Sequence, residues 1–181
     1  MFRESLLAET PCINPKTLIG RTVSINLAEL INQESKYYMN MKFKIDRVEG
    51  KNAYTRFNGY HTAKDRLFRV VRKKLQKVRT MDTINTKDNW KIQITMTTIL
   101  NRNTDAKVQK KVRKSIEDFL KKNGEKSTVD DIIRSVISGS IQKNIKKFGS
   151  KIYPVRFTEV EKIEVIKPGP LEGVEKSSHS V

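Results

Sequence analysis

The sequence contains few of the residues on which disulfides, metal sites and redox chemistry depend. Among its 181 residues Cys12 is the single cysteine, and His61 and His179 are the only histidines. One cysteine excludes an internal disulfide, and two distant histidines leave no spacing that matches a zinc site. We therefore expect neither a metal nor another cofactor.

Long apolar runs, a signal peptide and glycine-rich phosphate loops are also missing. Mean hydropathy is −0.59, and no apolar run approaches the roughly 20 residues that a membrane-spanning helix needs. The N-terminus lacks the basic and then apolar pattern of a signal peptide, and neither common phosphate-loop pattern occurs. The sequence predicts a cytoplasmic protein with no membrane contact and no small-molecule substrate.

Catalytic side chains do not form a recognisable set. Cys12 has no partner base, and Asp46, Asp65, Asp82 and Asp88 fall in separate expected turns and strands. Helix capping or solubility explains each carboxylate more simply than a two-metal nuclease site does. We expect no enzymatic activity.

Positive charge, by contrast, is abundant. Lys and Arg number 37 against 20 Asp and Glu, so the net charge is +17, and the isoelectric point is near 10.0. Such a surplus repels itself in the folded state and is expected to meet a polyanion. Nucleic acid is the leading candidate, and an acidic membrane surface is a distant second.

The chain is organised around residues 90–123, where a strand leads directly into a basic helix. Apolar side chains alternate from Trp90 to Leu100, which predicts a strand with one buried and one wetter face. The period then lengthens, and Val108, Val112 and Ile116 mark one side of a helix over 104–123, capped by Asn103 or Thr104. Its other side carries Lys107, Lys110, Arg113, Lys114 and Lys121.

Three short strands precede this unit. Alternating apolar residues predict strands over 20–31, 41–46 and 53–57, arranged as an antiparallel meander that Gly59 ends. A helix is then expected over 62–79, with an apolar stripe through Leu67, Val71, Leu75 and Val78. This segment is rich in bases, and Asp65 is its single acid.

Local signals define the remaining elements. Residues 81–86 are expected to pair with the central strand as a hairpin across 87–89. Ser127 or Thr128, followed by two aspartates, predicts the capped start of a helix whose core side is Ile132, Ile133, Val136 and Ile137. A break at 138–140 separates it from a short helix with Ile141, Ile145 and Phe148 on its core side, closed by Gly149. A last strand over 155–166 is expected to contain a bulge near Glu159.

These elements predict an α+β fold, a mostly antiparallel sheet or small barrel flanked by amphipathic basic helices. We expect an N-terminal arm over 1–19, a single RNA-binding domain over 20–167 and a disordered tail over 168–181. His61 either stacks on an unpaired base or is an ordinary turn residue, and Trp90 is expected in the core. The candidate RNA-binding residues are Arg21, Lys51, Arg56, Lys64, Arg66, Arg69, Arg72, Lys73, Lys77, Arg79, Arg102, Lys107, Lys110, Lys111, Arg113 and Lys114.

Several short motifs occur in one order across residues 20–157. They are Gly20-Arg21, Leu27-Ala28-Glu29-Leu30, Val48-Glu49-Gly50-Lys51-Asn52, then Thr55, Phe57, Gly59, Lys64-Asp65-Arg66, Thr86-Lys87-Asp88 and Ile152-Tyr153-Pro154. Together they resemble a family of small-subunit ribosomal proteins of archaea and eukaryotes called S3Ae, in a compact, archaeal-looking form. Two departures are Ser24 and Asn26, where the family usually has an acid and a serine. The Lys-rich segment that precedes this region in the family is not seen before Met1, so either the sequence starts late or this member lacks that RNA contact.

The resemblance implies a non-enzymatic protein that assembles on small-subunit ribosomal RNA at the platform, near the messenger exit region, beside other platform ribosomal proteins. The residues alone leave a second class open: a non-ribosomal nucleic-acid-binding protein, either a DNA architectural factor or an unrecognised nuclease. A DNA reader should present base-reading side chains on an exposed helix. The expected exposed faces carry almost only Lys and Arg, which position a protein on phosphates without reading sequence.

Overall fold

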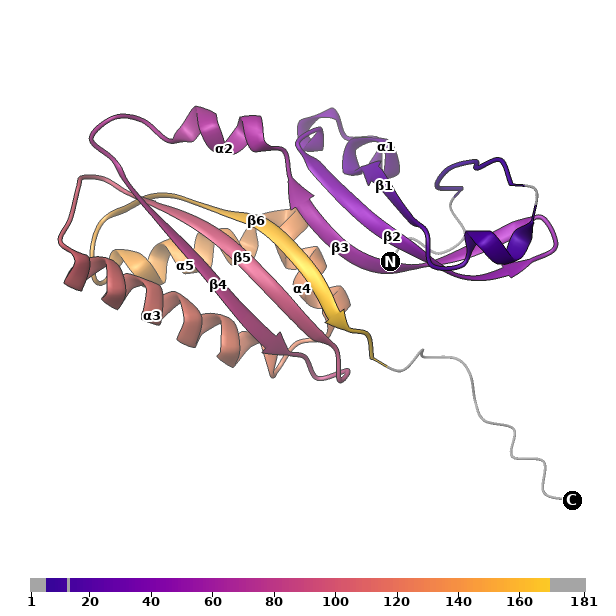
Figure 1. Ribbon diagram of the computed structural model, residues 1–181. Coiled ribbons are helices and arrows are strands. Elements are labelled where there is room, and N and C mark those ends of the chain that lie inside the picture. The colour runs from indigo at the N-terminus through magenta and orange to yellow at the C-terminus, as the bar shows by residue number, and fades with distance from the viewer. Residues whose placement is uncertain (1–5, 13, 170–181) are drawn as a thin grey trace, which may run out of the picture.

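A single open sheet of six strands runs through the molecule, in the order β1-β2-β3-β6-β5-β4 (Figure 1). The computed structural model describes residues 6–12 and 14–169. Every pair of neighbouring strands is antiparallel, which confirms the α+β prediction, and the sheet does not close into a barrel. The strands are β1 (Thr22–Asn26), β2 (Met39–Glu49), β3 (Asn52–Thr62), β4 (Gln76–Asn85), β5 (Lys91–Leu100) and β6 (Val155–Lys167).

Strands β1 to β3 form the predicted meander, but the first strand is shorter than expected. It ends at Asn26, whose side-chain oxygen accepts the N–H of Ala28 at 2.9 Å and so caps helix α1 (Leu27–Ile31). Leu27, which fitted the alternation of a longer strand, is instead the first residue of a helical turn and is completely buried there. Two short 3-10 helices, η1 (Pro15–Leu18) and η2 (Glu34–Lys36), lie before β1 and before β2.

The prediction that Gly59 ends the meander is wrong, because β3 continues to Thr62. At Gly59 the backbone of β3 passes so close to β6 that an added Cβ would lie 2.6 Å from the carbonyl oxygen of Ile163. Glycine is needed here because any side chain would separate the two strands. The pairing of β3 with β6 covers only 59–61 against 162–164, and it joins the two halves of the sheet.

The expected helix over 62–79 is also wrong in its second half. Helix α2 (Lys64–Val70) ends after two turns, and β4 begins at Gln76. In β4 the buried Val78 and Thr80 alternate with the exposed Lys77 and Arg79. This period of two is that of a strand, although Val78 also fits the helical spacing of Leu67, Val71 and Leu75. The crowding of like charges along the segment also disfavours a long helix.

Three helices cover one face of the β4-β5-β6 half (Figure 1). They are α3 (Ala106–Gly124), α4 (Val129–Ser138) and α5 (Ser140–Ser150). The predicted capping box is present at Thr128 and Asp131, and Gly139 separates α4 from α5 with a φ of 78°. The cap predicted for α3 is wrong, because Asp105 occupies that position and makes no side-chain cap hydrogen bond.

The core differs from the prediction at the edges of two elements. β5 is buried on both faces, not on one, since Thr95, Thr97 and Ile99 are as inaccessible as the apolar residues between them. Phe148, expected in the core, is 44% exposed at the end of α5, while Gly149 lies inside α5 and does not end it. The β6 bulge is confirmed, with Glu161 skipped in the pairing with β5. The predicted tail lies mostly outside the described residues.

Candidate nucleic-acid interface

Helix α3 presents a row of cations to solvent, as its sequence predicted. Val112, Ile116 and Leu120 are buried against the sheet, which turns the opposite side of the helix outward. Lys107, Lys110, Lys111 and Lys114 are exposed and form no ion pair with a described residue. Their charges are therefore available to an external anion.

Further cations gather around the start of α3. Gln76 pairs with Leu100, so the loop before β4 and the loop after β5 lie at the same end of the sheet (Figure 1). The first loop carries Arg72 and Lys73, and the second carries Arg102, all of them exposed. The exposed Lys77 follows at the start of β4. We call these residues, together with the α3 row, the cationic end: Arg72, Lys73, Lys77, Arg102, Lys107, Lys110, Lys111 and Lys114.

Three predicted RNA-binding arginines are instead held by carboxylates. Arg56 forms an ion pair with Asp46 at 3.2 Å, and Arg79 forms two hydrogen bonds with Glu161, at 3.2 and 3.0 Å. Arg66 lies 3.9 Å from Glu159, with its guanidinium 4.2 Å from the centre of the Tyr38 ring. Arg113 remains exposed, but its Nε donates to the carbonyl oxygen of Arg79.

The other candidates are scattered. Lys51 lies in the turn between β2 and β3, and Arg21 precedes β1, so both lie away from the cationic end (Figure 1). Lys64 and Arg69 are exposed on α2. The structure therefore brings half of the predicted residues together at one end and leaves the rest separate.

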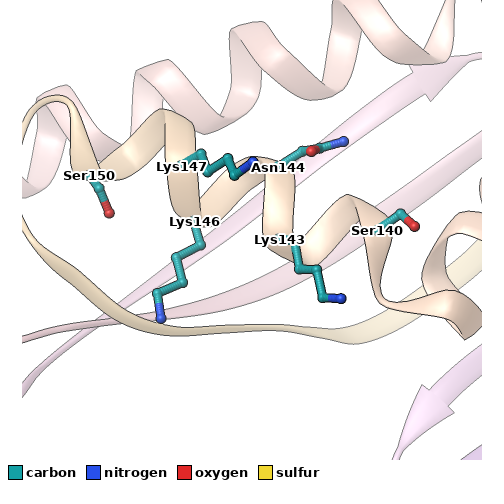
Figure 2. A pocket seen from close by; sticks show the side chains of 6 residues that line it. All are labelled: Ser140, Lys143, Asn144, Lys146, Lys147 and Ser150. Carbon is teal, nitrogen blue, oxygen red and sulfur yellow. The ribbon is translucent and has the colours of Figure 1, made fainter.

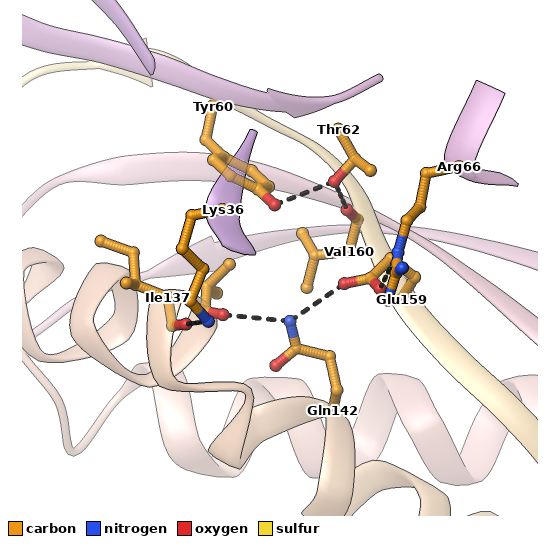
Figure 3. A network of polar contacts seen from close by, with 9 residues as sticks. Lys36, Tyr60, Thr62, Arg66, Ile137, Gln142, Glu159 and Val160 are labelled. Atoms are coloured by element: carbon orange, nitrogen blue, oxygen red, sulfur yellow. Dashed lines mark hydrogen bonds and ion pairs between the residues drawn. The ribbon is translucent and has the colours of Figure 1, made fainter. Parts of the chain in front are cut away.

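Arg66 belongs to a polar junction between the two halves of the sheet (Figure 3). Gln142 on α5 donates to the carboxylate of Glu159 at 3.2 Å and to the carbonyl oxygen of Val136 at 3.1 Å. From the other side, Lys36 donates to the carbonyl oxygen of Ile137 at 2.7 Å. Burial raises the pKa of Glu159, and the Gln142 hydrogen bond and the Arg66 charge only partly offset that shift.

A second link in this junction joins β3 to β6. The hydroxyl of Thr62 donates to the carbonyl oxygen of Val160 at 2.7 Å, which leaves its oxygen to accept from the Tyr60 hydroxyl at 2.8 Å. Burial raises the pKa of Tyr60 well above its ordinary value, so the hydroxyl stays protonated. This link is structural, because the hydroxyls of Tyr60 and Thr62 and the carbonyl oxygen of Val160 are all paired with one another.

His61 lies within β3, and not at a loop tip as predicted. It pairs with Asn40 and Lys162, and burial lowers its pKa, with the charges of Lys42 and Lys162 adding to the effect. A neutral, half-buried ring in a strand is poorly placed to stack on a base. Trp90 packs against the core as expected.

Three of the four aspartates that a nuclease site would need have separate structural roles. Asp46 pairs with Arg56, Asp82 with Lys121, and Asp88 accepts the N–H of Val129. Among residues 6–12 and 14–169, no group of three or more His, Cys, Asp and Glu side chains is placed to hold a metal ion. No helix in that part of the chain is long and apolar enough to span a membrane.

A further cationic surface, absent from the predicted set, lies on α5. Lys143, Lys146 and Lys147 project around a hollow on the outer side of this helix (Figure 2). The sequence does contain a signal for this surface. Lys146 and Lys147 follow Lys143 by three and four residues, while Ile141 and Ile145 mark the buried side of the same helix. The signal was hidden because the segment is short and was interpreted only for its core side.

Comparison with known proteins places this sequence in one family. A sequence model described as the Ribosomal S3Ae family matches residues 1–169. The chain belongs to the Ribosomal S3Ae family. Relatives named small ribosomal subunit protein eS1 are 30% identical in Methanobrevibacter smithii, over 91% of this chain and 86% of that protein. The eS1 protein of Aeropyrum pernix is also 30% identical, over 98% of this chain and 85% of its own length.

Membership of the S3Ae family agrees with the resemblance recognised in the sequence. The eS1 protein of Saccharolobus islandicus extends the match to 100% of this chain and 87% of its own length, at 30% identity. The match therefore includes the cationic end as well as α5.

Proposed function

We propose that this protein is a structural constituent of the small ribosomal subunit that binds ribosomal RNA through the cationic end. The observation that carries the proposal is the α3 row, whose lysines have no carboxylate partner among the described residues. Membership of the S3Ae family supports the same proposal. Unpaired lysines on a rigid helix suit the phosphates of an RNA backbone. The same reasoning makes translation in the cytoplasm its setting.

The phosphate contacts are assigned to the exposed members of the predicted set. Arg56, Arg66 and Arg79 are engaged with carboxylates, so they contribute less than Lys107, Lys110 and Lys114. We place the protein at the platform near the messenger exit region, beside other platform ribosomal proteins, on the strength of the family resemblance. No step of this function requires a metal, a cofactor or catalysis.

Sedimentation tests the proposal. A tagged form of the chain, expressed in an archaeal host, should co-sediment with particles of small-subunit size at moderate salt and crosslink to small-subunit ribosomal RNA. In vitro, contacts to six to ten phosphates would weaken binding by roughly 10³ to 10⁵ between about 50 and 200 mM salt. A salt-independent affinity, or sedimentation at the top of the gradient, would refute the proposal and favour a non-ribosomal role.

A further inference from the structure

We infer that the outer side of α5 is a second RNA-contact surface, which binds phosphates of the ribosomal RNA backbone independently of the α3 row. This inference rests on the proposed function, since it assumes that RNA is the partner. The surface consists of Lys143, Lys146 and Lys147, with Ser140, Asn144 and Ser150 (Figure 2), and it is called the α5 face below.

The α5 lysines lie on a helix that is held in place by its buried side. Ile141 and Ile145 are buried at 8% and 0% exposure and fix α5 against the rest of the fold. Lys143 and Lys147 are four residues apart, which places them one above the other, about 6 Å apart along the helix axis. Lys146 lies on the adjoining side of the same turn, and all three lysines line one hollow. The side chains of Lys143 and Lys146 extend the same way, while that of Lys147 lies along the helix toward Asn144 (Figure 2).

The charge of the α5 face is not offset by acidic residues of the helix. From Ser140 to Ser150 the helix has no acidic residue, and none of its three lysines forms an ion pair with a described residue. The carboxylate of Glu159 beneath the helix is already engaged by Gln142 and Arg66. Helix α3, in contrast, contains Glu117 and Asp118 among its cations. The α5 face is therefore the more purely cationic of the two helical surfaces.

The groups around the α5 lysines are also suited to phosphate. Two serine hydroxyls and the Asn144 amide line the same hollow, and such groups contact phosphate oxygens together with lysines in nucleic-acid complexes. At the end of the helix the ring of Phe148 is 44% exposed, packs 5.2 Å from Phe119 and has the Lys151 ammonium 4.9 Å away. An exposed ring beside cations is typical of surfaces that bind RNA loops.

The test compares two triple variants with equal loss of charge. Lys143, Lys146 and Lys147 are replaced by Gln in one, and Lys87, Lys91 and Lys167 in the control, all three of which are exposed around the β4–β5 hairpin. Binding to small-subunit ribosomal RNA transcribed in vitro is titrated over a range of salt concentrations. The α5 variant should lower the slope of log affinity against log salt by about two to three units, because each lost phosphate contact removes about one. The control should leave it nearly unchanged.

A second measurement needs no variant. Acylation of lysine amines in the wild-type protein, with and without the RNA, should show Lys143, Lys146 and Lys147 protected by RNA and Lys87 equally reactive in both. Equal slopes for the two triple variants, with no protection, would overturn the α5 inference. A variant of Lys107, Lys110 and Lys114 that still loses slope would then leave the proposed function intact.

Two other outcomes are also decisive. Protection of these lysines in whole small subunits, but not by RNA alone, would mean that a protein covers the α5 face, and the inference would be wrong. A flat salt response of the wild-type protein would remove the proposed function and this inference together.

Discussion

Arginines on the strands of this protein and lysines on its helices have different surroundings. Most of the strand arginines lie beside carboxylates: Arg47 near Glu49, Arg56 near Asp46, and Arg79 near Glu161. On α3 and α5 most of the lysines are exposed and form no ion pair with a described residue. A strand must share its face with the neighbouring strands, whereas a helix can bury one side and devote the other to a single charge.

This difference shows which part of the net charge is available to a partner. Counting Lys and Arg treats all cations alike, but Arg47, Arg56 and Arg79 are paired with carboxylates within the fold. We expect the unpaired lysines of α3 and α5 to carry the interaction with a polyanion, and we expect experiments to separate them from the paired arginines.

The largest effect should come from breaking the buried side of α3. Ile116 is fully buried against the sheet, so Ile116→Ala leaves a cavity and should cost about 2–5 kcal/mol of the free energy of unfolding. The matched control is Ile166→Ala, at a side chain that is 53% exposed, and it should change stability by no more than about 0.5 kcal/mol. Thermal and urea denaturation measure both. Equal effects would mean that α3 is rotated relative to the sheet.

The comparison itself is tested by two sets of charge removals. Lys107, Lys110 and Lys114→Gln should lower the salt slope of RNA binding by about two to three units. Arg47, Arg56 and Arg79→Gln should lower it by less than about one, because carboxylates already hold those side chains. RNA titrations at several salt concentrations decide the matter. A larger loss from the strand set would place the RNA surface on the sheet.

A smaller effect should reveal the ion pairs of the strands directly. A double-mutant cycle of Arg79→Gln and Glu161→Gln should give a coupling of about 0.2–1 kcal/mol, since the pair is partly exposed to solvent. The same cycle for Lys110 and Glu161 should give none, as Lys110 forms no ion pair with a described residue. Denaturation of the four proteins in each cycle supplies the values. No coupling at Arg79 would show that its charge remains available.

The smallest effect concerns pH. The pKa of Glu159 is raised in the folded state by burial, so the unfolded chain releases this proton first as pH rises. Wild-type stability should therefore fall as pH rises through the raised pKa, while Glu159→Gln removes that loss. Between about pH 4.5 and 7.5, the melting midpoint of the variant should rise relative to that of the wild type as pH increases. The exposed Glu164→Gln is the control, and a difference that moves the opposite way would contradict the assignment.

Elements with local signals were predictable from the sequence. The β4–β5 hairpin, the Thr128–Asp131 capping box and the break at Gly139 each depend on a few neighbouring residues. The exposed row of α3 was also predictable, because its apolar stripe fixes which side faces outward.

Features that depend on distant residues were not. Arg79 looked available until the fold brought Glu161, 82 residues later, beside it. Gly59 was interpreted as a terminator because the approach of β6 is invisible in the sequence around it. The end of α2 was missed because Val78 fits a helical stripe and a strand equally well, and only the pairing of β4 with β5 decides between them.

The position of β6 has a consequence for how the chain is made. Among the described residues it is the last strand along the chain, yet it lies in the middle of the sheet, between β3 and β5. While the chain is being synthesised, β3 and β5 therefore each expose an unpaired edge, and such edges invite association with other chains. The two halves become one sheet only when residues 155–167 emerge, so the sheet is completed after β5 and helices α3 to α5 have already been made.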